Sequence, residues 1–312
     1  MNQEPTISYR RQFVILLALI GVFTVIGSFL IIMLASTNLN VSMTLVPELL
    51  NKSENANLAR WLNTLATFFM FFMPAFLFAR ILSRKPLDYL GFNRLMNGKQ
   101  IGIVVVLTLA AMITSGALGD LNQRIPLPAT WMAKARAMED AYRSTMMSMA
   151  MMKNFKEYLL VLLVVATAPA IFEEVLFRGT FQQLFIGWTK NAWIGIIITS
   201  IVFSVIHISY FGFLPRLALG MVLGFIFYYG KNIWLNILLH FLNNALIVTG
   251  IYQDIKHGQS IEKAMDENMP IWWIGLFGIA GLLLLFRLFK KETRKVLATQ
   301  SPVATDENSI EQ

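Results

Sequence analysis

A chain of 312 residues that is 56% hydrophobic and only 14% charged, with a mean hydropathy of +0.59, lies outside the range of soluble domains. Its composition predicts an integral membrane protein. The absence of cysteine excludes a thiol nucleophile, a thiolate zinc site and a disulfide framework. The net charge of +8 fits loop lysines and arginines that face anionic lipid headgroups, and no nucleic-acid motif accompanies it.

Long apolar runs follow one another along the chain. The first, Phe13–Ala35, is longer than a signal-peptide core and lacks a small-residue cleavage site, so we interpret it as a retained anchor helix. Seven more runs follow, most of them near the ~20 residues that a bilayer requires, at roughly 61–79, 101–119, 158–177, 193–209, 214–230, 233–250 and 271–286. They are continuously apolar and do not alternate, which indicates helices and not barrel strands. We predict an all-α, polytopic membrane bundle of about eight transmembrane helices.

The distribution of basic residues predicts the orientation of this bundle. With eight spans, the side that holds both termini carries fourteen Lys and Arg residues, and the opposite side carries eleven. Because basic loops stay on the cytoplasmic side, we expect both termini in the cytoplasm. Gly220 and Gly224 form a small-x-x-x-small pair in the sixth span, which suits close helix contact.

The long loop before the fourth span carries the pattern of an amphipathic helix. From Trp131 to Met152, apolar residues recur at three-to-four spacing while the charges fall elsewhere. Pro128 followed by Thr130 supplies a start. The helix either lies on the membrane surface or packs against the bundle, or its methionine face helps to admit a substrate.

The chain divides into three parts. Residues 1–156 hold the first three spans and the amphipathic helix, residues 157–250 hold the polar core of spans four to seven, and residues 251–312 hold the last span and a tail. Beyond Lys295 the tail has no apolar pattern, and we expect it to be disordered.

Two adjacent carboxylates and a guanidinium lie inside the fourth span. An ionised side chain near the middle of a membrane costs at least about 2.5 kcal/mol, so Glu173, Glu174 and Arg178 need a compensating reason. Glu174 and Arg178 are four residues apart and can form an ion pair on one helix face. Glu173 projects about 100° away and is free to face a cavity. The alternative is a buried network of three charges without chemistry.

Two histidines lie in later spans. A helical hairpin that turns near Lys190 and Asn191 would hold Glu173 and His207 at one depth, about 25 Å from the turn. His240 and Asn244 share a stripe of the seventh span. For His240 to reach the same depth, the fourth helix must extend beyond the membrane surface before it turns.

These groups fit hydrolysis. A water between Glu173 and His207 would meet a general base and an imidazole that relays its proton, while His240 and Asn244 could donate to the oxyanion. Alternatively, Glu173, His207 and His240 could form a two-His-one-carboxylate site for zinc or another divalent metal. The residues alone leave both possibilities open.

Other membrane-protease chemistries fit less well. The chain has no His-Glu-x-x-His zinc helix and no pair of aspartates within spans. Ser204 lies one turn before His207 on the same predicted helix, an arrangement with no preferred attack geometry.

Three motifs in order carry a family resemblance: Glu173-Glu174-x-x-x-Arg178, then Phe203-x-x-x-His207, then His240-x-x-x-Asn244. Over residues 157 to 250 the chain resembles the CPBP family of type II CAAX prenyl endopeptidases and bacteriocin-processing or immunity proteins. The resemblance implies an intramembrane CAAX-like endopeptidase, either a metalloprotease or a metal-free glutamate type. It implies catalytic roles for Glu173, His207, His240 and Asn244, with Glu174, Arg178 and Phe203 as supporting residues.

The implied substrate is a membrane-embedded or lipidated peptide or protein, and the implied location is a bacterial plasma membrane. Prenylation of the substrate does not follow from the resemblance. A second hypothesis is a non-proteolytic binding or bacteriocin-immunity protein that keeps the polar site for its structure. Proton-coupled transport is disfavoured because no inverted repeat or paired broken helices are apparent.

Overall fold

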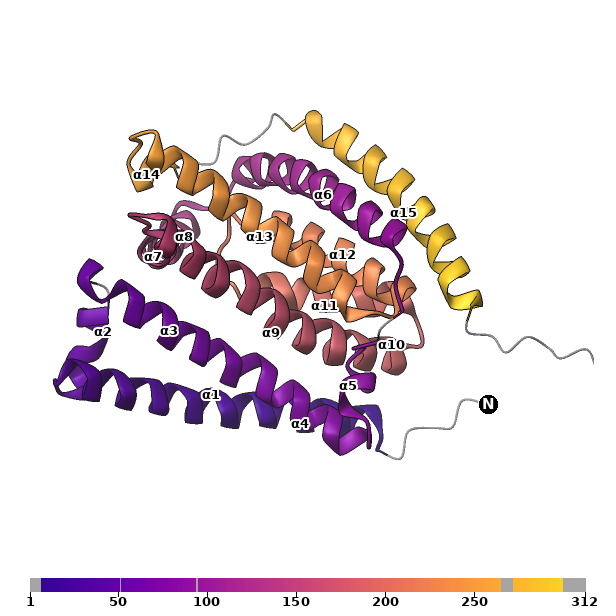
Figure 1. The fold of residues 1–312 in the computed structure, drawn as a ribbon, viewed down its shortest axis with the longest axis horizontal. Helices are drawn as coiled ribbons and strands as arrows, with labels where there is room; N and C mark the ends of the chain where they lie inside the picture. Colours follow the sequence, from indigo (N-terminus) through magenta and orange to yellow (C-terminus); the bar gives the residue numbers. More distant parts are fainter. Residues whose placement is uncertain (1–6, 51, 94, 265–271, 300–312) are drawn as a thin grey trace, which may run out of the picture.

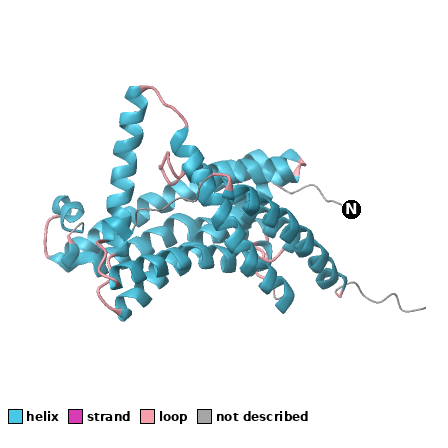
Figure 2. Ribbon diagram, turned by 90° about the horizontal axis from the view of Figure 1, so that it is seen from above, coloured by secondary structure: helices cyan, strands magenta, loops and turns pink. Residues whose placement is uncertain are grey.

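The chain folds into an all-α bundle in a computed structural model that describes residues 7–50, 52–93, 95–264 and 272–299. Helices and loops make up these described residues, without strands (Figure 2). Six helices of the described residues are long and apolar enough to cross a membrane: Tyr9–Leu39, Ala56–Leu82, Gly98–Arg124, Phe155–Thr189, Phe213–Gly230 and Ile233–Lys256. The predicted helical membrane bundle is confirmed at this level.

The count of eight spans is not confirmed. The fifth predicted span is the short helix α11 (Ala192–Val205), which has 14 residues. The last predicted span falls on α15 (Ile274–Ala298), whose first 18 residues include Arg287, Lys290 and Lys291. The disordered tail was predicted beyond Lys295, but α15 continues to Ala298 and residues 300–312 lie outside the described residues.

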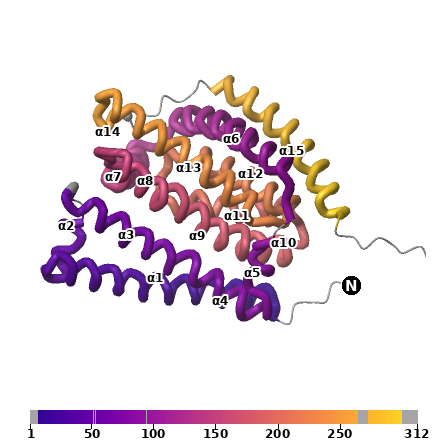
Figure 3. The backbone as a smooth tube through the Cα atoms, in the orientation of Figure 1, coloured from indigo at the N-terminus to yellow at the C-terminus, as the bar shows by residue number. Residues whose placement is uncertain are grey.

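The helices form layers around a central group (Figures 1 and 3). On one side, α1 (Tyr9–Leu39) lies along a helix made of α3 (Ala56–Thr67), η3 (Phe68–Phe72) and α4 (Met73–Leu82). On the opposite side, α15 lies along α6 (Gly98–Arg124). Between them lie the helices that carry the predicted site: α9 (Ala168–Leu176), α10 (Gln183–Thr189), α11, α12 (Phe213–Gly230) and α13 (Ile233–Lys256).

The fourth long helix runs through the middle of the bundle from Phe155 to Thr189. It consists of α8 (Phe155–Val161), the π-helical turn η4 (Leu162–Thr167), α9, the π-helical turn η5 (Phe177–Gln182) and α10. Its 35 residues correspond to about 50 Å, well beyond the ~30 Å of a hydrocarbon core. This length agrees with the expectation that the helix extends past the membrane surface before it turns.

The turn after this helix lies where the sequence predicted it. Lys190 has a φ of 55° and ends α10 in the left-handed conformation. The Asn191 side chain then caps α11 by accepting hydrogen bonds from the backbone N–H groups of Trp193 and Ile194. The helix and α11 therefore form the expected antiparallel hairpin.

Small residues bring α11 and α12 close together. A Cβ at Gly220 would lie 3.1 Å from the Cα of Ser200, and one at Gly224 would lie 2.6 Å from a methyl carbon of Ile196. The predicted role of this glycine pair in helix packing is confirmed. The close approach also exposes the carbonyl oxygens of both glycines to side chains of the fourth helix.

The long loop contains the predicted helix, α7 (Ala129–Ala150), which begins directly after Pro128. Figure 1 views α7 nearly end-on, so it crosses the direction of the other helices. The C-terminal end of α7 is held by Arg60 of α3, which is fully buried. The guanidinium of Arg60 donates to the carbonyl oxygens of Met149 and Met151. Trp131, at the other end of α7, is exposed.

Candidate active site

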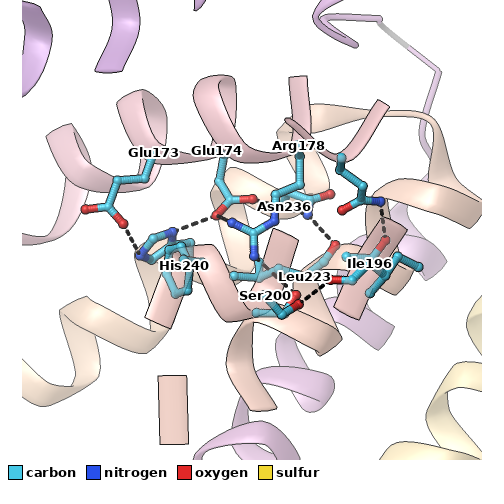
Figure 4. A network of polar contacts seen from close by, with 12 residues as sticks. Glu173, Glu174, Arg178, Ile196, Ser200, Leu223, Asn236 and His240 are labelled. Carbon is cyan, nitrogen blue, oxygen red and sulfur yellow. Dashed lines mark hydrogen bonds and ion pairs between the residues drawn. The ribbon is translucent and has the colours of Figure 1, made fainter. Parts of the chain in front are cut away.

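The Glu174 carboxylate is the centre of a buried polar network (Figure 4). It is fully buried on α9, and its Oε1 accepts from Nη1 of Arg178 at 2.9 Å and from Nδ1 of His240 at 2.8 Å. The predicted ion pair between Glu174 and Arg178 is therefore present. Because a carboxylate only accepts, the contact also places a proton on Nδ1 of His240 and leaves Nε2 facing the other way.

Arg178 extends this network to α12. It is fully buried, its Nη2 donates to the carbonyl oxygen of Gly220 at 3.2 Å, and its guanidinium lies 4.9 Å from the Phe203 ring centroid. The aromatic face and the helix carbonyl offset part of the cost of burying the charge. Arg178 thereby fixes the position of α9 relative to both α11 and α12.

Asn236 is a member of the network that the sequence analysis missed. Its Nδ2 donates to the Leu223 carbonyl oxygen at 2.7 Å and lies 3.3 Å from Oε2 of Glu174. Asn236 precedes His240 by four residues, so Asn236, His240 and Asn244 recur on one stripe of α13. That spacing was the signal that could have identified it.

Glu173 differs from Glu174 because one of its carboxylate oxygens, Oε2, has no hydrogen-bond partner among the described residues. The residue is 8% exposed, and its Oε2 is buried without a hydrogen bond from any described residue. The same oxygen lies 3.9 Å from Nε2 of His240, beyond hydrogen-bond distance. Figure 4 shows His240 between the two carboxylates, with one ring nitrogen towards each.

His207 does not lie on a helix, contrary to our prediction. The predicted span reached residue 209, but α11 ends at Val205, and the His207 backbone N–H donates to the Ser204 carbonyl. The Phe203 carbonyl therefore lacks its helical donor, and Nδ1 of His207 donates to it at 2.7 Å. This contact fixes the ring orientation and leaves Nε2 of His207 with a lone pair in the neutral form.

The Phe203 ring lies between the two imidazoles. Its centroid is 5.0 Å from that of His207 and 6.0 Å from that of His240. The structure thus brings Glu173, His207 and His240 into one neighbourhood around Phe203.

The loop after His207 has its polar groups satisfied inside the protein. Asn122, buried on α6, donates to the Tyr210 carbonyl at 2.9 Å and accepts from the Leu214 backbone N–H at 3.0 Å. Oγ of Ser204 donates to the Phe213 carbonyl at 2.7 Å. Oγ of Ser209 donates to Glu139 on α7 at 2.7 Å, which connects the loop to the amphipathic helix.

Asn244 lies on the same helix as His240 but is engaged elsewhere. Its Oδ1 accepts from Nδ2 of Asn243 at 3.2 Å, and its own Nδ2 lies 3.5 Å from the Val165 carbonyl of η4. The structure gives it no hydrogen bond to Glu173, His207 or His240. Its amide is half-buried and lies one helical turn from the imidazole of His240.

The residues do not form a ready metal site. Across residues 7–264 and 272–299, apart from positions 51 and 94, no group of three carboxylates, imidazoles or thiolates is arranged to hold a metal ion. Nδ1 of His240 and Nδ1 of His207 are both used within the protein. A histidine that donates from Nδ1 within the protein keeps Nε2 as a possible ligand, so these contacts do not argue against a metal. Among the described residues, however, Glu173, His207 and His240 are not gathered as the three-ligand zinc set that the sequence left open.

Fold and site together define a polytopic helical membrane protein with a buried carboxylate–imidazole cluster. Residues 155–246 match the family model of the type II CAAX prenyl endopeptidase, Rce1-like. The matched segment runs from α8 to α13 and contains every predicted site residue, so the predicted family resemblance is confirmed for this part of the chain. The matching model is named for endopeptidases, and the buried cluster of Glu173, Glu174 and His240 is consistent with a polar site of that kind. Comparisons with curated proteins and with solved structures gave no match.

The buried ion pair should matter far more for stability than an exposed one of the same spacing. We expect Glu174→Gln or Arg178→Met to reduce the free energy of unfolding by about 3–5 kcal/mol, because each leaves an uncompensated buried charge. Thermal unfolding of the purified protein in detergent would measure this. The matched control is Arg124→Met in the i,i+4 pair Asp120–Arg124, whose arginine side chain is 61% exposed, where a change of at most about 1 kcal/mol is expected. Equal effects at both pairs would contradict the structural role of Glu174.

Proposed function

We propose that this protein is an intramembrane endopeptidase that hydrolyses a peptide bond of a membrane-associated peptide or protein with water activated by Glu173 and His207. The observation that carries the proposal is the pair of adjacent carboxylates with opposite environments. Glu174 is saturated with hydrogen bonds, whereas the buried Oε2 of Glu173 has none from the described residues. A buried carboxylate oxygen needs a donor, and a substrate water supplies one.

The proposed reaction uses Glu173 as general base. The oxygen of a water attacks the carbonyl carbon of the scissile peptide bond while its proton passes to Glu173. The proton then moves to the leaving nitrogen as the carbon–nitrogen bond breaks, which regenerates the carboxylate. Nε2 of His207, held by the Phe203 carbonyl, accepts a hydrogen bond from the same water and aligns it for attack.

The proposed role of His240 is to stabilise the oxyanion. Nδ1 of His240 donates to Glu174, so Nε2 can donate only in the form of the imidazole that carries a second proton. Nε2 then becomes a donor that points towards the Glu173 side of the site. Asn244 is proposed as the second donor once substrate displaces its weak contact to Val165.

Glu174, Arg178 and Asn236 act through His240 and are positioning residues. Glu174 holds the imidazole of His240 through Nδ1 and thereby sets the direction of Nε2. Arg178 and Asn236 hold Glu174 in turn, through contacts that also reach carbonyl oxygens of α12. Phe203 is proposed to support the site through its carbonyl and its ring.

Removing the proposed base or its partner should abolish cleavage without unfolding the protein. Glu173→Gln and His207→Ala are each expected to reduce the rate by at least about 100-fold, because general acid–base groups contribute about that much. The assay is mass-spectrometric detection of new termini in a mixture of amphipathic peptides embedded in phospholipid vesicles. His257→Ala, at the exposed end of α13, is the control and should leave cleavage unchanged.

Retained cleavage in either variant would contradict the mechanism. If the protein confers a phenotype that survives Glu173→Gln but is lost with Arg178→Met, the non-proteolytic binding or immunity hypothesis would explain it better.

Catalysis is proposed to need no metal, because the donor geometry does not gather three ligands. Cleavage in the vesicle assay should therefore persist after treatment with 1,10-phenanthroline or EDTA. Elemental analysis of the same preparation provides the comparison. Loss of activity with the chelator, restored by added zinc, would overturn this part of the proposal.

We also propose that α11 and α15 complete an eight-span arrangement in a bacterial plasma membrane, with both termini in the cytoplasm. The first described residues of α1 and the last of α15 lie towards the same side of the bundle (Figure 1). The excess of Lys and Arg on that side supports the orientation.

Because the native chain has no cysteine, single introduced cysteines report this topology directly. Ser8→Cys and Lys190→Cys should be protected from a membrane-impermeant maleimide in intact cells, whereas Ser260→Cys should be labelled. Labelling of all three only after lysis, or labelling of Ser8→Cys in intact cells, would contradict the arrangement.

A further inference from the structure

Arg216, in the first turn of α12, is a cation that the proposed mechanism does not use. One of its guanidinium nitrogens, Nη1, is buried and has no hydrogen-bond partner among the described residues. Its guanidinium carbon lies 4.8 Å from the ring centroid of Tyr142 on α7. A partly buried guanidinium held against an aromatic face, without a carboxylate on its edge, is an anion-binding arrangement that lacks its anion.

This cation lies at the far end of the loop that begins at His207. The guanidinium lies over the backbone at Gly212, where any Cβ would collide with it. Gly212 belongs to the loop that begins at His207, so Arg216 and His207 lie at the two ends of one short, internally braced turn.

The neighbouring acid does not neutralise Arg216. Glu139 lies one helical turn before Tyr142 on α7, but its carboxylate accepts from Oγ of Ser209 and forms no ion pair with Arg216 in the structure. Arg178, the other buried guanidinium of the site, is by contrast paired with Glu174 at 2.9 Å. Each arginine has one buried nitrogen without a partner among the described residues, Nε in Arg178 and Nη1 in Arg216, but of the two only Arg178 has a carboxylate partner.

We infer that Arg216 binds a carboxylate of the substrate and thereby sets the position of the scissile bond between Glu173 and His207. This inference rests on the proposed function. A peptide offers anionic groups only as carboxylates, and the planar guanidinium fork matches a carboxylate with two parallel hydrogen bonds. The Tyr142 ring lies against the guanidinium, and none of the described residues accepts a hydrogen bond from Nη1. The carboxylate is either the C-terminus of the peptide or an acidic side chain near the cleaved bond.

Binding to uncleaved peptides tests the inference separately from catalysis. Glu173→Gln protein would be titrated with dansylated amphipathic peptides that differ only in a free or amidated C-terminus, or only in Glu or Gln at one internal position. Replacing the recognised carboxylate by its amide should raise the Kd about 10- to 100-fold, the size expected for a charged hydrogen-bonded pair. The pair of peptides that shows the effect identifies the source of the carboxylate.

The double variant Glu173→Gln, Arg216→Gln should no longer discriminate between the two peptides, so that the acid and the amide bind equally weakly. Arg216→Lys should retain part of it, because the charge remains but the fork is lost. Lys134→Gln on the exposed face of α7 is the matched control and should bind as the parent does. In the cleavage assay, Arg216→Gln should lower kcat/KM for the peptide with the recognised carboxylate to the value of its amide counterpart.

Two results would overturn the inference. One is equal binding of the acid and amide peptides by the Glu173→Gln protein, a measurement that needs no variant at Arg216. The other is an Arg216→Gln variant that lowers kcat equally for acid and amide peptides, which would make Arg216 an oxyanion donor or a structural residue. If Glu173→Gln itself still cleaves while the discrimination is present, the base is wrong but the carboxylate site stands.

Discussion

The buried carboxylate of Glu174 is the constraint on which the rest of the structure depends. A charge removed from both water and lipid is tolerated only where every neighbour donates to it, and here α9 supplies Arg178 while α13 supplies His240 and Asn236. These partners also reach the carbonyl oxygens of Gly220 and Leu223, so one carboxylate fixes the mutual positions of three helices. At the same depth of the bundle, α11 packs closely on α12 at Gly220. The Gly220 carbonyl oxygen there accepts the hydrogen bond from Arg178.

Two consecutive glutamates acquire different properties because a helix turns about 100° per residue. Glu174 faces the helix–helix contact and is neutralised there, whereas Glu173 faces the imidazole edge of His240 at 3.9 Å and keeps a free oxygen. The adjacent pair thus provides one carboxylate that is satisfied within the fold and one that keeps an oxygen free. His240 lies between them, with one ring nitrogen towards each carboxylate.

Local periodicity predicted the elements whose geometry depends only on the helix itself. The i,i+4 pair of Glu174 and Arg178, the turn at Lys190 and the extension of the fourth helix all follow from rise and angle per residue. The position of His207 could not be predicted in this way, because a run of apolar residues does not show where a helix ends. The loop that follows α11 is held by Asn122 of α6, a residue far away in sequence. Asn236 was missed for the related reason that its partner carbonyl, Leu223, belongs to another helix.

The early end of α11 places non-helical backbone inside an apolar bundle. Non-helical backbone at membrane depth is tolerated only where protein or a water-filled cavity surrounds it, since lipid cannot satisfy its N–H and C=O groups. Here the side chains of Asn122 and Ser204 donate hydrogen bonds to carbonyl oxygens of the loop. Ser209 of the loop donates to Glu139 and so connects the loop to α7. A straight, uninterrupted helix would have kept the Phe203 carbonyl in its own ladder and left the imidazole of His207 without the partner that orients it. The break therefore gives the Phe203 carbonyl a side-chain partner and fixes the ring of His207 in a single local change. The bundle tolerates that change because Asn122, Ser204 and Ser209 hydrogen-bond the loop inside the protein.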